Sequence, residues 1–215
     1  GSHKMTRYCL LGEKLSHSLS PFIHNHLFCQ SNLDAEYGLM EAELTDLPNA
    51  VDTLRAQFAG FNVTVPYKTE IIKYLDELSP CAKAVGAVNT VINKGGKLIG
   101  HNTDGTGFMK ALEQGGVSLE GQKVLVLGAG GAARVIVYML AKAGAQVCIH
   151  NRTPKRAQEL IDDLNITGIS LIEQTGLAGR WHLIVNTTSL GMYPENMEKT
   201  LLMPGQTQGA DYVFD

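Results

Sequence analysis

The stretch Lys123-Val-Leu-Val-Leu-Gly128-Ala-Gly130-Gly131-Ala-Ala133-Arg134 has the residue types of a nucleotide site. Its apolar start predicts a strand, its glycines a tight turn, and its alanine-rich end a helix. The N–H groups and dipole at the start of such a helix favour a pyrophosphate, which the glycine backbone lets approach. Glycines also simply make turns, but the spacing Gly128-x-Gly130-x-x-Ala133 fits the dinucleotide fingerprint in its strand and helix context. The predicted contacts are Gly128, Ala129, Gly130, Gly131 and Ala132.

The residues after the next predicted strand, 146–150, indicate which dinucleotide binds. NAD requires an acidic residue there to bind the ribose 2′-hydroxyl, and the sequence Asn151-Arg152-Thr153-Pro154-Lys155-Arg156 has none. Its basic side chains surround a predicted helix start, with Thr153 as N-cap, and suit a 2′-phosphate. The alternative is a solvated basic helix start, which the upstream glycine turn makes the weaker interpretation. We therefore expect NADP, with contacts from Asn151, Arg152, Thr153 and Arg156.

A third group of polar residues follows the predicted strand 181–185. The sequence there is Asn186-Thr187-Thr188-Ser189, a turn of small polar side chains at the carboxyl end of a strand. Such a turn is expected to face the nicotinamide half of the cofactor, because ligands bind at the carboxyl ends of strands in open α/β sheets. We expect Thr188 and Ser189 to contact the cofactor.

Polar residues also follow predicted strands in the first half of the chain. Ser20 before Pro21 predicts a helix N-cap, which leaves Ser18 in the same loop without a structural reason. Lys68 follows a strand that Pro66 ends, at the position where α/β sheets place ligands, although most such lysines are solvated. Asp104 precedes a predicted helix, where capping is the commoner role of an aspartate.

These groups require elements that alternate between strands and helices. In the first half we expect strands at 7–11, 36–43, 60–65, 87–93 and 98–100 and helices at 20–30, 46–57, 80–86 and 106–114. The glycines at 115–116 and the polar stretch to Gln122 predict a domain boundary. The fold class is therefore α/β with two domains. They are an N-terminal α/β substrate domain (4–114) and a C-terminal Rossmann-type dinucleotide-binding domain (117–215).

Composition limits the possible functions. The chain has 215 residues, of which 44% are hydrophobic and 18% charged, with a net charge of −3, so it lacks the basic footprint of a nucleic-acid binder. Its 4 cysteines show no CxxC pair and no zinc spacing, which favours reduced thiols and no metal site. No apolar run predicts a membrane span or a signal peptide, so we expect a cytoplasmic protein. Gly1-Ser2-His3 resembles the remnant of an expression tag.

Six blocks taken together resemble the shikimate dehydrogenase family, in its order and spacing over almost the whole chain. The blocks are His17-Ser18-Leu19-Ser20-Pro21, Asn62-Val-Thr-Val-Pro-Tyr-Lys68, Gly86-Ala-Val-Asn89-Thr90, Gly100-His-Asn102-Thr103-Asp104-Gly105, Gly128-Ala-Gly-Gly-Ala132 and Asn151-Arg152-Thr153. The resemblance implies an oxidoreductase that reduces 3-dehydroshikimate to shikimate with NADPH, in the route to chorismate and the aromatic amino acids. It implies a small-molecule substrate and a monomer or homodimer.

The resemblance also assigns roles to residues. It implies that Ser18 and Ser20 bind the substrate carboxylate, that Thr64, Asn89 and Asp104 hold the ring hydroxyls, and that Lys68 with Asp104 forms the catalytic pair. Hydride transfer to a ketone leaves an alkoxide that must gain a proton, which a lysine ammonium can supply. The alternatives left open are a quinate/shikimate dehydrogenase that uses NAD and a non-catalytic ligand-binding paralogue.

Two departures from the family pattern stand out. Family members continue for several tens of residues past the match to Asp215, through helices that complete the first domain and bring a glutamine to the substrate. A chain that ends at Asp215 is therefore expected to bind NADP, to turn over shikimate poorly and to self-associate. The family's usual tyrosine near the last strand is Phe214 here, which removes a hydroxyl expected near the substrate.

Overall fold

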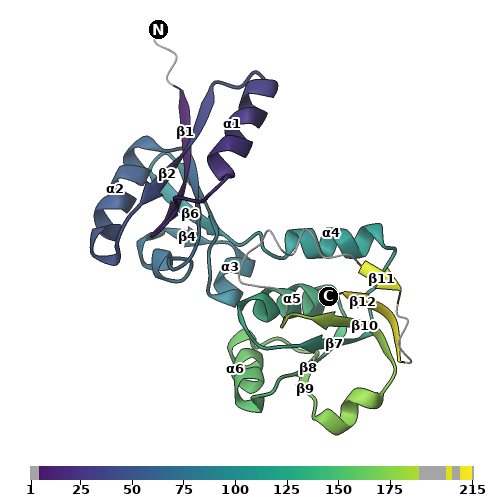
Figure 1. Cartoon of the computed structure of the whole chain (residues 1–215). Helices are drawn as coiled ribbons and strands as arrows, with labels where there is room; N and C mark the ends of the chain where they lie inside the picture. The colour runs from purple at the N-terminus through teal and green to yellow at the C-terminus, as the bar shows by residue number, and fades with distance from the viewer. Residues whose placement is uncertain (1–4, 189–201, 205–208, 215) are drawn as a thin grey trace. The chain divides into compact units, whose positions relative to one another are not determined.

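The structure is a computed structural model that describes residues 5–188, 202–204 and 209–214. The chain divides into two compact units, residues 1–102 and 103–215, and in the described part each contains one six-stranded sheet (Figure 1). The α/β class and the two-domain organisation predicted from the sequence are confirmed. The division falls before helix α4 (Thr106–Gln114), whereas the sequence placed it after that helix.

Helix α4 belongs to the second unit because its apolar side packs there. The Phe108 ring is completely buried and meets the Phe214 ring edge-on, with 4.9 Å between centroids. Just before α4, a Cβ added to Gly105 would lie 2.9 Å from side-chain atoms of Val135 and Met139. The pair Gly115-Gly116, which predicted the boundary, instead closes α4 within the second unit: the Gly115 N–H donates to the Ala111 carbonyl at 3.0 Å.

The sheet of the first unit mixes parallel and antiparallel strands in the order β2-β1-β3-β5-β6-β4. Its strands are β1 (Thr6–Gly12), β2 (Ala35–Glu41), β3 (Gly60–Val63), β4 (Glu77–Leu78), β5 (Thr90–Lys94) and β6 (Lys97–His101). Strands β1, β2 and β3 run parallel, and β5 runs antiparallel to both β3 and β6. Gly95 and Gly96 both have positive φ, at 60° and 94°, so they form the tight turn that joins β5 to β6.

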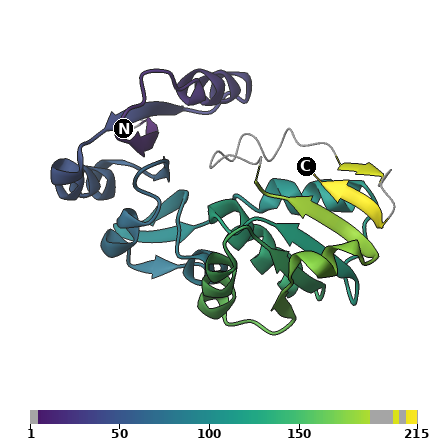
Figure 2. The ribbon, with the colours of Figure 1, turned by 60° about the horizontal axis from the view of Figure 1, so that its bottom comes forward.

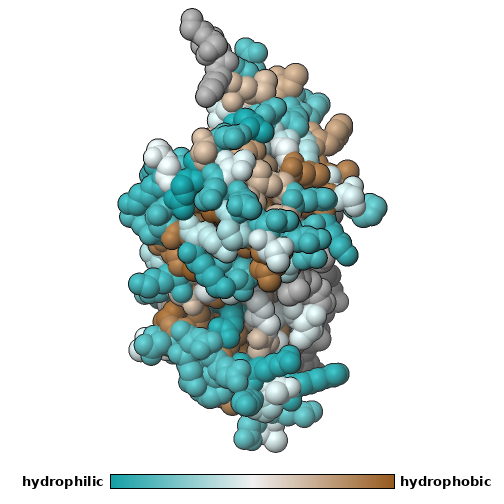
Figure 3. Space-filling view, turned by 90° about the vertical axis from the view of Figure 1, so that its left-hand side faces the viewer, coloured by the Kyte–Doolittle hydropathy of each residue, from teal (hydrophilic) through white to brown (hydrophobic). Residues whose placement is uncertain are grey.

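Three α-helices are described in the first unit, and only some of them bury side chains. They are α1 (Ser20–Gln30), α2 (Leu47–Gln57) and α3 (Pro80–Val85), and the 3-10 turns Leu44–Asp46 and Glu70–Tyr74 accompany them. Helix α2 buries Leu47, Val51 and Leu54, whose spacing places them on one face. Helix α1 has no buried residue, and Phe22 on it is 74% exposed. Figure 3 shows hydrophobic side chains of this kind at several places in a mostly hydrophilic surface.

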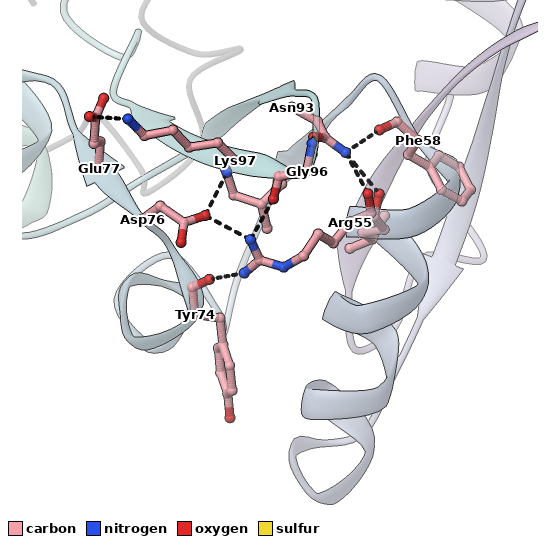
Figure 4. A network of polar contacts seen from close by, with 10 residues as sticks. Arg55, Phe58, Tyr74, Asp76, Glu77, Asn93, Gly96 and Lys97 are labelled. Carbon is pink, nitrogen blue, oxygen red and sulfur yellow. Dashed lines mark hydrogen bonds and ion pairs between the residues drawn. The ribbon is translucent and has the colours of Figure 1, made fainter.

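A network of polar contacts joins helix α2 to the β5–β6 hairpin (Figure 4). The Arg55 guanidinium donates to the Asp76 carboxylate at 2.7 Å and to the carbonyls of Gly96 and Tyr74 at 2.7 and 2.8 Å. The Asp76 carboxylate also accepts the Leu98 N–H at 2.8 Å. This backbone hydrogen bond and the Arg55 guanidinium hold the pKa of Asp76 below its ordinary value. The network therefore connects helix α2, the segment 74–76 and the β5–β6 hairpin, at the edge of the sheet where β5 ends.

The second unit has the strand order of a dinucleotide-binding fold, β11-β12-β10-β7-β8-β9. Its strands are β7 (Lys123–Leu127), β8 (Gln146–His150), β9 (Ile169–Leu171), β10 (Trp181–Asn186), β11 (Leu202–Pro204) and β12 (Ala210–Phe214). All are parallel except β11, which the sequence did not predict. The yellow strands β12 and β11 lie at one edge of the sheet (Figure 2). Counted along the chain, the parallel order is 3-2-1-4-5, as in Rossmann folds.

Two helices cover one face of this sheet. Helix α5 (Gly131–Lys142) contacts β7 and β8, and α6 (Pro154–Leu164) contacts β8, β9 and α5. Six residues of α5 are buried, among them Ala133 at the third fingerprint position. A small residue is needed there because the helix lies close to the sheet. Within the described ranges, no helix is both long and apolar enough to cross a membrane.

Candidate functional site

The glycine turn after β7 depends on Gly128. Its N–H donates to the His150 carbonyl at 2.9 Å, which ties the turn to the end of β8. Its φ is +110°, a conformation that residues with a Cβ rarely adopt. A Cβ at this position would also overlap the hydroxyl of Thr187, which is buried and donates to the Leu127 carbonyl at 2.7 Å. The turn can therefore form only with glycine at 128.

The other two glycines serve a different purpose. Gly130 has an ordinary φ of −87°, and a Cβ added to Gly130 or Gly131 would meet nothing within 4 Å. Space is therefore open over the start of α5, and no side chain caps the first turn of that helix. The free N–H groups of an uncapped helix start attract anions. Gly128 to Ala132 thus have the geometry that a pyrophosphate requires.

The basic residues predicted to select NADP lie at the start of α6. Arg152 and Arg156 are both exposed, and neither side chain has an ion pair or hydrogen bond to another residue in the part of the chain described. Thr153 occupies the N-cap position as predicted, but its hydroxyl does not cap the helix. Instead the Asn151 side-chain N–H donates to the Thr153 carbonyl at 3.0 Å. Two positive charges are therefore available beside the end of β8.

The turn after β10 is only partly described. The Asn186 side-chain oxygen accepts two hydrogen bonds from Thr188, from its hydroxyl at 2.5 Å and from its N–H at 3.0 Å. These bonds hold Thr188 in an exposed turn at the carboxyl end of β10, where it was predicted. Ser189, the other residue predicted to contact the nicotinamide half, lies outside the described residues.

The candidate substrate residues of the first unit gather at one edge of its sheet. Strands β1 and β3 are parallel and end at this edge, and the antiparallel β5 starts there. The Thr64 N–H after β3 donates to the Leu11 carbonyl at the end of β1, at 3.0 Å. The Lys68 carbonyl accepts the Val88 N–H at 2.8 Å, next to Asn89. Thr64 and Lys68, in the segment after β3, and Asn89, just before β5, therefore come to the same edge.

The start of helix α1 corrects one prediction. Ser20 is the first residue of the helix and not its N-cap, which is Leu19. The Ser18 hydroxyl oxygen accepts the Ser20 N–H at 3.2 Å. Ser18 therefore has a structural role at the helix start, which the sequence did not predict. With Leu19 at the N-cap, Ser20 and Pro21 both lie in the first turn of the helix, where proline is well tolerated. Both serines are half-buried, Ser18 in the loop after β1 and Ser20 at the start of α1, and a hydroxyl that accepts can still donate.

Asn89 stands out because it is a polar residue with only 6% exposure. Its side-chain oxygen accepts the Thr90 hydroxyl at 3.1 Å, and the Thr90 oxygen accepts the Asn62 side-chain N–H at 3.1 Å. The Asn62 side-chain oxygen in turn accepts the Tyr37 hydroxyl at 2.9 Å. Sequence reasoning missed Tyr37 and Thr90, because tyrosine and threonine are ordinary strand residues. The alternation of Asn62 and Thr64 with valines was the signal for this polar face.

Asp104 lies in the second unit, half-buried, two residues after Asn102. The Asn102 side chain donates to the Ala87 carbonyl at 3.1 Å, which fixes the last residue of the first unit beside the segment before Asn89. The N-cap of α4 is Gly105, so Asp104 precedes the cap position. Among the described residues, no three His, Cys, Asp or Glu side chains come together in a way that could hold a metal ion.

The 3-2-1-4-5 sheet and the open glycine turn after β7 are those of a Rossmann-type dinucleotide-binding protein, and the chain also carries a second α/β unit. Family models narrow this class. Residues 10–91 match the shikimate dehydrogenase substrate binding domain, and residues 110–194 match the shikimate/quinate 5-dehydrogenase family. The chain belongs to the shikimate dehydrogenase family.

Individual relatives agree with this assignment. The NADP(+) shikimate dehydrogenase of Bacillus cereus (strain G9842) is 44% identical over 194 residues, which are 87% of this chain and 70% of the relative. The Thermus thermophilus enzyme in complex with NADP(H) and shikimate is 40% identical, with a TM-score of 0.72 over 86% of this chain and 69% of that one. The Listeria monocytogenes enzyme in complex with shikimate and NAD is 36% identical, with a TM-score of 0.79 over 92% and 72%.

Proposed function

We propose that this chain is an enzyme that reduces 3-dehydroshikimate to shikimate with NADPH, a step toward chorismate and the aromatic amino acids. Its family membership supports the proposal, as do relatives named as NADP(+) shikimate dehydrogenases. The observation that carries it is the gathering of Thr64, Lys68 and Asn89 at one sheet edge of the unit whose sequence matches a substrate binding domain.

The second unit binds the cofactor. Gly128, Ala129, Gly130, Gly131 and Ala132 hold the pyrophosphate at the start of α5, where a Cβ on Gly130 or Gly131 would take up the open space. Arg152 and Arg156 bind the 2′-phosphate with help from Asn151 and Thr153, since guanidinium groups match phosphate oxygens. Thr188 and Ser189 contact the nicotinamide half. The bound dinucleotide supplies the hydride.

The first unit and Asp104 bind the substrate. Ser18, in the loop after β1, and Ser20, at the start of α1, donate hydrogen bonds to the shikimate carboxylate. Thr64, Asn89 and Asp104 hold the ring hydroxyls. An aspartate and an amide suit this task because together they can both accept and donate hydrogen bonds.

Lys68 and Asp104 form the catalytic pair. As the substrate carbonyl carbon gains a hydride, negative charge develops on its oxygen. The Lys68 ammonium stabilises that oxygen and transfers a proton to it, which completes the hydroxyl and leaves the lysine neutral. The Asp104 carboxylate orients the lysine and the substrate. In the oxidation of shikimate, Lys68 takes the proton back.

We also infer a cytoplasmic enzyme that acts on a small molecule as a monomer or homodimer, with no nucleic-acid or membrane partner. The scattered cysteines support a reducing compartment, and the net charge of −3 offers no attraction to nucleic acid. The oligomeric state can be measured directly by sedimentation or light scattering.

The test is an assay that follows the absorbance of the reduced cofactor, NADPH or NADH, with four pairs of reactants. Shikimate and quinate are each offered with NADP and with NAD. The proposal requires turnover with shikimate and NADP well above the other three pairs. Equal turnover of quinate with NAD would favour the quinate/shikimate alternative, which the NAD bound to the Listeria relative makes worth testing. Binding of both ligands without turnover would identify a non-catalytic paralogue.

A further inference from the structure

We propose that Tyr37, Asn62 and Thr90 are positioning residues that fix which edge of the Asn89 side-chain amide faces the substrate. The inference rests on the proposed function, in which Asn89 holds a ring hydroxyl. An asparagine amide has an accepting edge and a donating edge, and rotation by half a turn exchanges them. The three residues form a hydrogen-bonded chain across β2, β3 and β5 that ends on Asn89.

The orientation of Asn62 is set by a backbone carbonyl. Its side-chain nitrogen lies 3.4 Å from the Asn89 carbonyl oxygen, which can only accept. The nitrogen must therefore stand on that side, and the oxygen must point to Tyr37, whose hydroxyl is 2.9 Å away. The second N–H of the same nitrogen donates to the Thr90 hydroxyl oxygen at 3.1 Å. Both ends of the Asn62 amide are thus satisfied in only one rotation.

The direction in which the Thr90 hydroxyl donates its proton is then fixed. A threonine hydroxyl has one proton, and its oxygen already accepts the bond from Asn62. The remaining proton points to the Asn89 side-chain oxygen at 3.1 Å. This oxygen is the accepting edge of Asn89, so the donating edge is the one turned to the other side. Flipping Asn89 would turn its N–H₂ toward Thr90 and take away the oxygen that accepts the Thr90 proton, the one acceptor which that hydroxyl has among the described residues.

Tyr37, the end of the hydrogen-bonded chain that lies away from Asn89, is held by contacts with helix α1. The Asn25 side chain on α1 donates to the Tyr37 carbonyl at 2.9 Å and accepts the Tyr37 N–H at 2.8 Å. The Tyr37 ring stacks on His24 with 4.3 Å between centroids, and its side chain is buried. Burial, together with the nearby Cys9, raises the pKa of Tyr37, so its hydroxyl keeps the proton that it donates to Asn62. The direction of the chain is therefore independent of physiological pH.

The direction of these hydrogen bonds determines which substrate atoms Asn89 can bind. An amide nitrogen that donates binds a substrate oxygen as an acceptor, and a ring hydroxyl bound in this way directs its own proton to a second group. The fixed Asn89 amide therefore favours a substrate oxygen that can accept, and it spares the enzyme the choice between two rotations on binding.

The experiment is a double-mutant cycle on shikimate binding, measured by calorimetry and by the Michaelis constant. Thr90→Val keeps the shape and removes the proton, and it should weaken shikimate binding about tenfold with a smaller change in turnover number. Thr90→Ser should restore near-normal binding because it keeps the hydroxyl. In an Asn89→Ala background, Thr90→Val should have little further effect, since Thr90 acts through Asn89. Additive effects, or normal binding by Thr90→Val, would overturn the proposal.

Two more variants test Tyr37 and Asn89, the two ends of the hydrogen-bonded chain. Tyr37→Phe should weaken shikimate binding about threefold, less than Thr90→Val, because the Asn89 carbonyl still holds Asn62. Asn89→Asp keeps an acceptor for Thr90 but has no donating edge, so it should bind shikimate as weakly as Asn89→Ala. Binding of NADP, which involves the second unit, should be unchanged in all of these proteins, and urea unfolding checks that the first unit still folds. An unmodified protein that neither binds nor oxidises shikimate would refute the proposed function itself, whereas the cycle addresses only the positioning.

Discussion

Gly128 and Thr187 lie so close together that a single added carbon would bring them into collision. The Thr187 hydroxyl is fixed by its hydrogen bond to the Leu127 carbonyl at 2.7 Å, and its N–H donates to the same carbonyl at 2.9 Å. The end of β7 and the end of β10 are thus joined under the glycine turn. Any residue larger than glycine at 128 must displace this contact and adopt a strained backbone.

Gly128→Ala should therefore damage both folding and cofactor binding. The strained φ alone should lower the free energy of unfolding by about 1–3 kcal/mol, and displacing Thr187 adds to this. Denaturant unfolding followed by circular dichroism measures the first effect, and fluorescence titration with NADPH measures the second. A variant with normal stability would show that the turn can rearrange.

Gly131→Ala is the matched control, with the opposite expected effect on stability. This glycine is the first residue of α5 and has space around it, so alanine should raise the free energy of unfolding by about 0.5–1 kcal/mol. The same methyl group occupies the space proposed for the pyrophosphate, so NADP should bind more weakly. A protein that is more stable yet binds NADP as before would place the pyrophosphate elsewhere.

Replacing Arg152 and Arg156 with glutamine should change the choice of cofactor. The loss of two charge-assisted contacts to a phosphate should weaken NADP binding by about 2–4 kcal/mol in total and leave NAD nearly untouched. Folding should not suffer, because neither side chain bonds to another described residue. Arg180→Gln is the control, since Arg180 is also exposed in the second unit but pairs with Asp211 at 2.8 Å. Equal losses for NADP and NAD would contradict the assignment.

The parts of the fold that follow local patterns could be predicted from the sequence. Strand β7, the glycine turn and α5 appeared nearly where the sequence placed them, because apolar runs and glycines have strong local preferences. Strand β11 was missed because three residues carry too little pattern. The structure divides the chain before α4, whereas Gly115-Gly116 looks like a linker in the sequence, because the Phe108–Phe214 packing is visible only in three dimensions.

The same contrast holds for the candidate site. The edge that collects Thr64, Lys68 and Asn89 follows from residues placed at strand ends, a rule that can be applied to a sequence. The chain from Tyr37 to Asn89 could not be predicted, since its members lie on three different strands whose register only the structure gives. Phe214, where the resemblance leads one to expect a tyrosine, has its ring fully buried against Phe108.

Lys68→Ala should lower the turnover number by about 10²–10⁴-fold with a small change in the Michaelis constant for shikimate. The reason is that the lysine acts mainly as charge develops on the substrate oxygen. Steady-state rates at several shikimate concentrations measure both constants. Lys73→Ala is the control, because Lys73 lies a few residues away, is exposed and pairs only with Glu70 at 2.7 Å in the described part. Near-normal turnover by Lys68→Ala would assign proton transfer to another group.

Ser18→Ala should have the opposite kinetic effect. The serine is proposed to bind the substrate carboxylate in ground state and transition state alike, so its loss should raise the Michaelis constant and leave the turnover number nearly unchanged. Because the Ser18 oxygen also accepts the Ser20 N–H, part of the effect would come from the helix start. Thermal unfolding separates the two contributions: a large fall in melting temperature without a change in the Michaelis constant would leave Ser18 with a structural role alone.

The Arg55–Asp76 contact should make the stability of the first unit depend on pH. The pKa of Asp76 is lowered in the folded state by the Leu98 N–H and by Arg55, so the folded protein holds the charged form more strongly than the unfolded chain does. The stabilisation is therefore complete above the unfolded pKa of about 4 and is lost as the pH falls through the lower folded value. Asp76→Asn should flatten the fall in unfolding free energy below about pH 4.

Urea unfolding at a series of pH values between about 3 and 6 measures this dependence. Asp211 in the second unit also has a lowered pKa, because of its hydrogen bond from His182 and the nearby Arg180, so the variant should reduce the acid sensitivity of the protein and not abolish it. Asp52→Asn is the control: Asp52 is exposed on the same helix as Arg55 and has no ion pair among the residues described. If Asp76→Asn and Asp52→Asn gave the same pH profile as the unmodified protein, the Arg55–Asp76 contact would contribute nothing to folding at neutral pH.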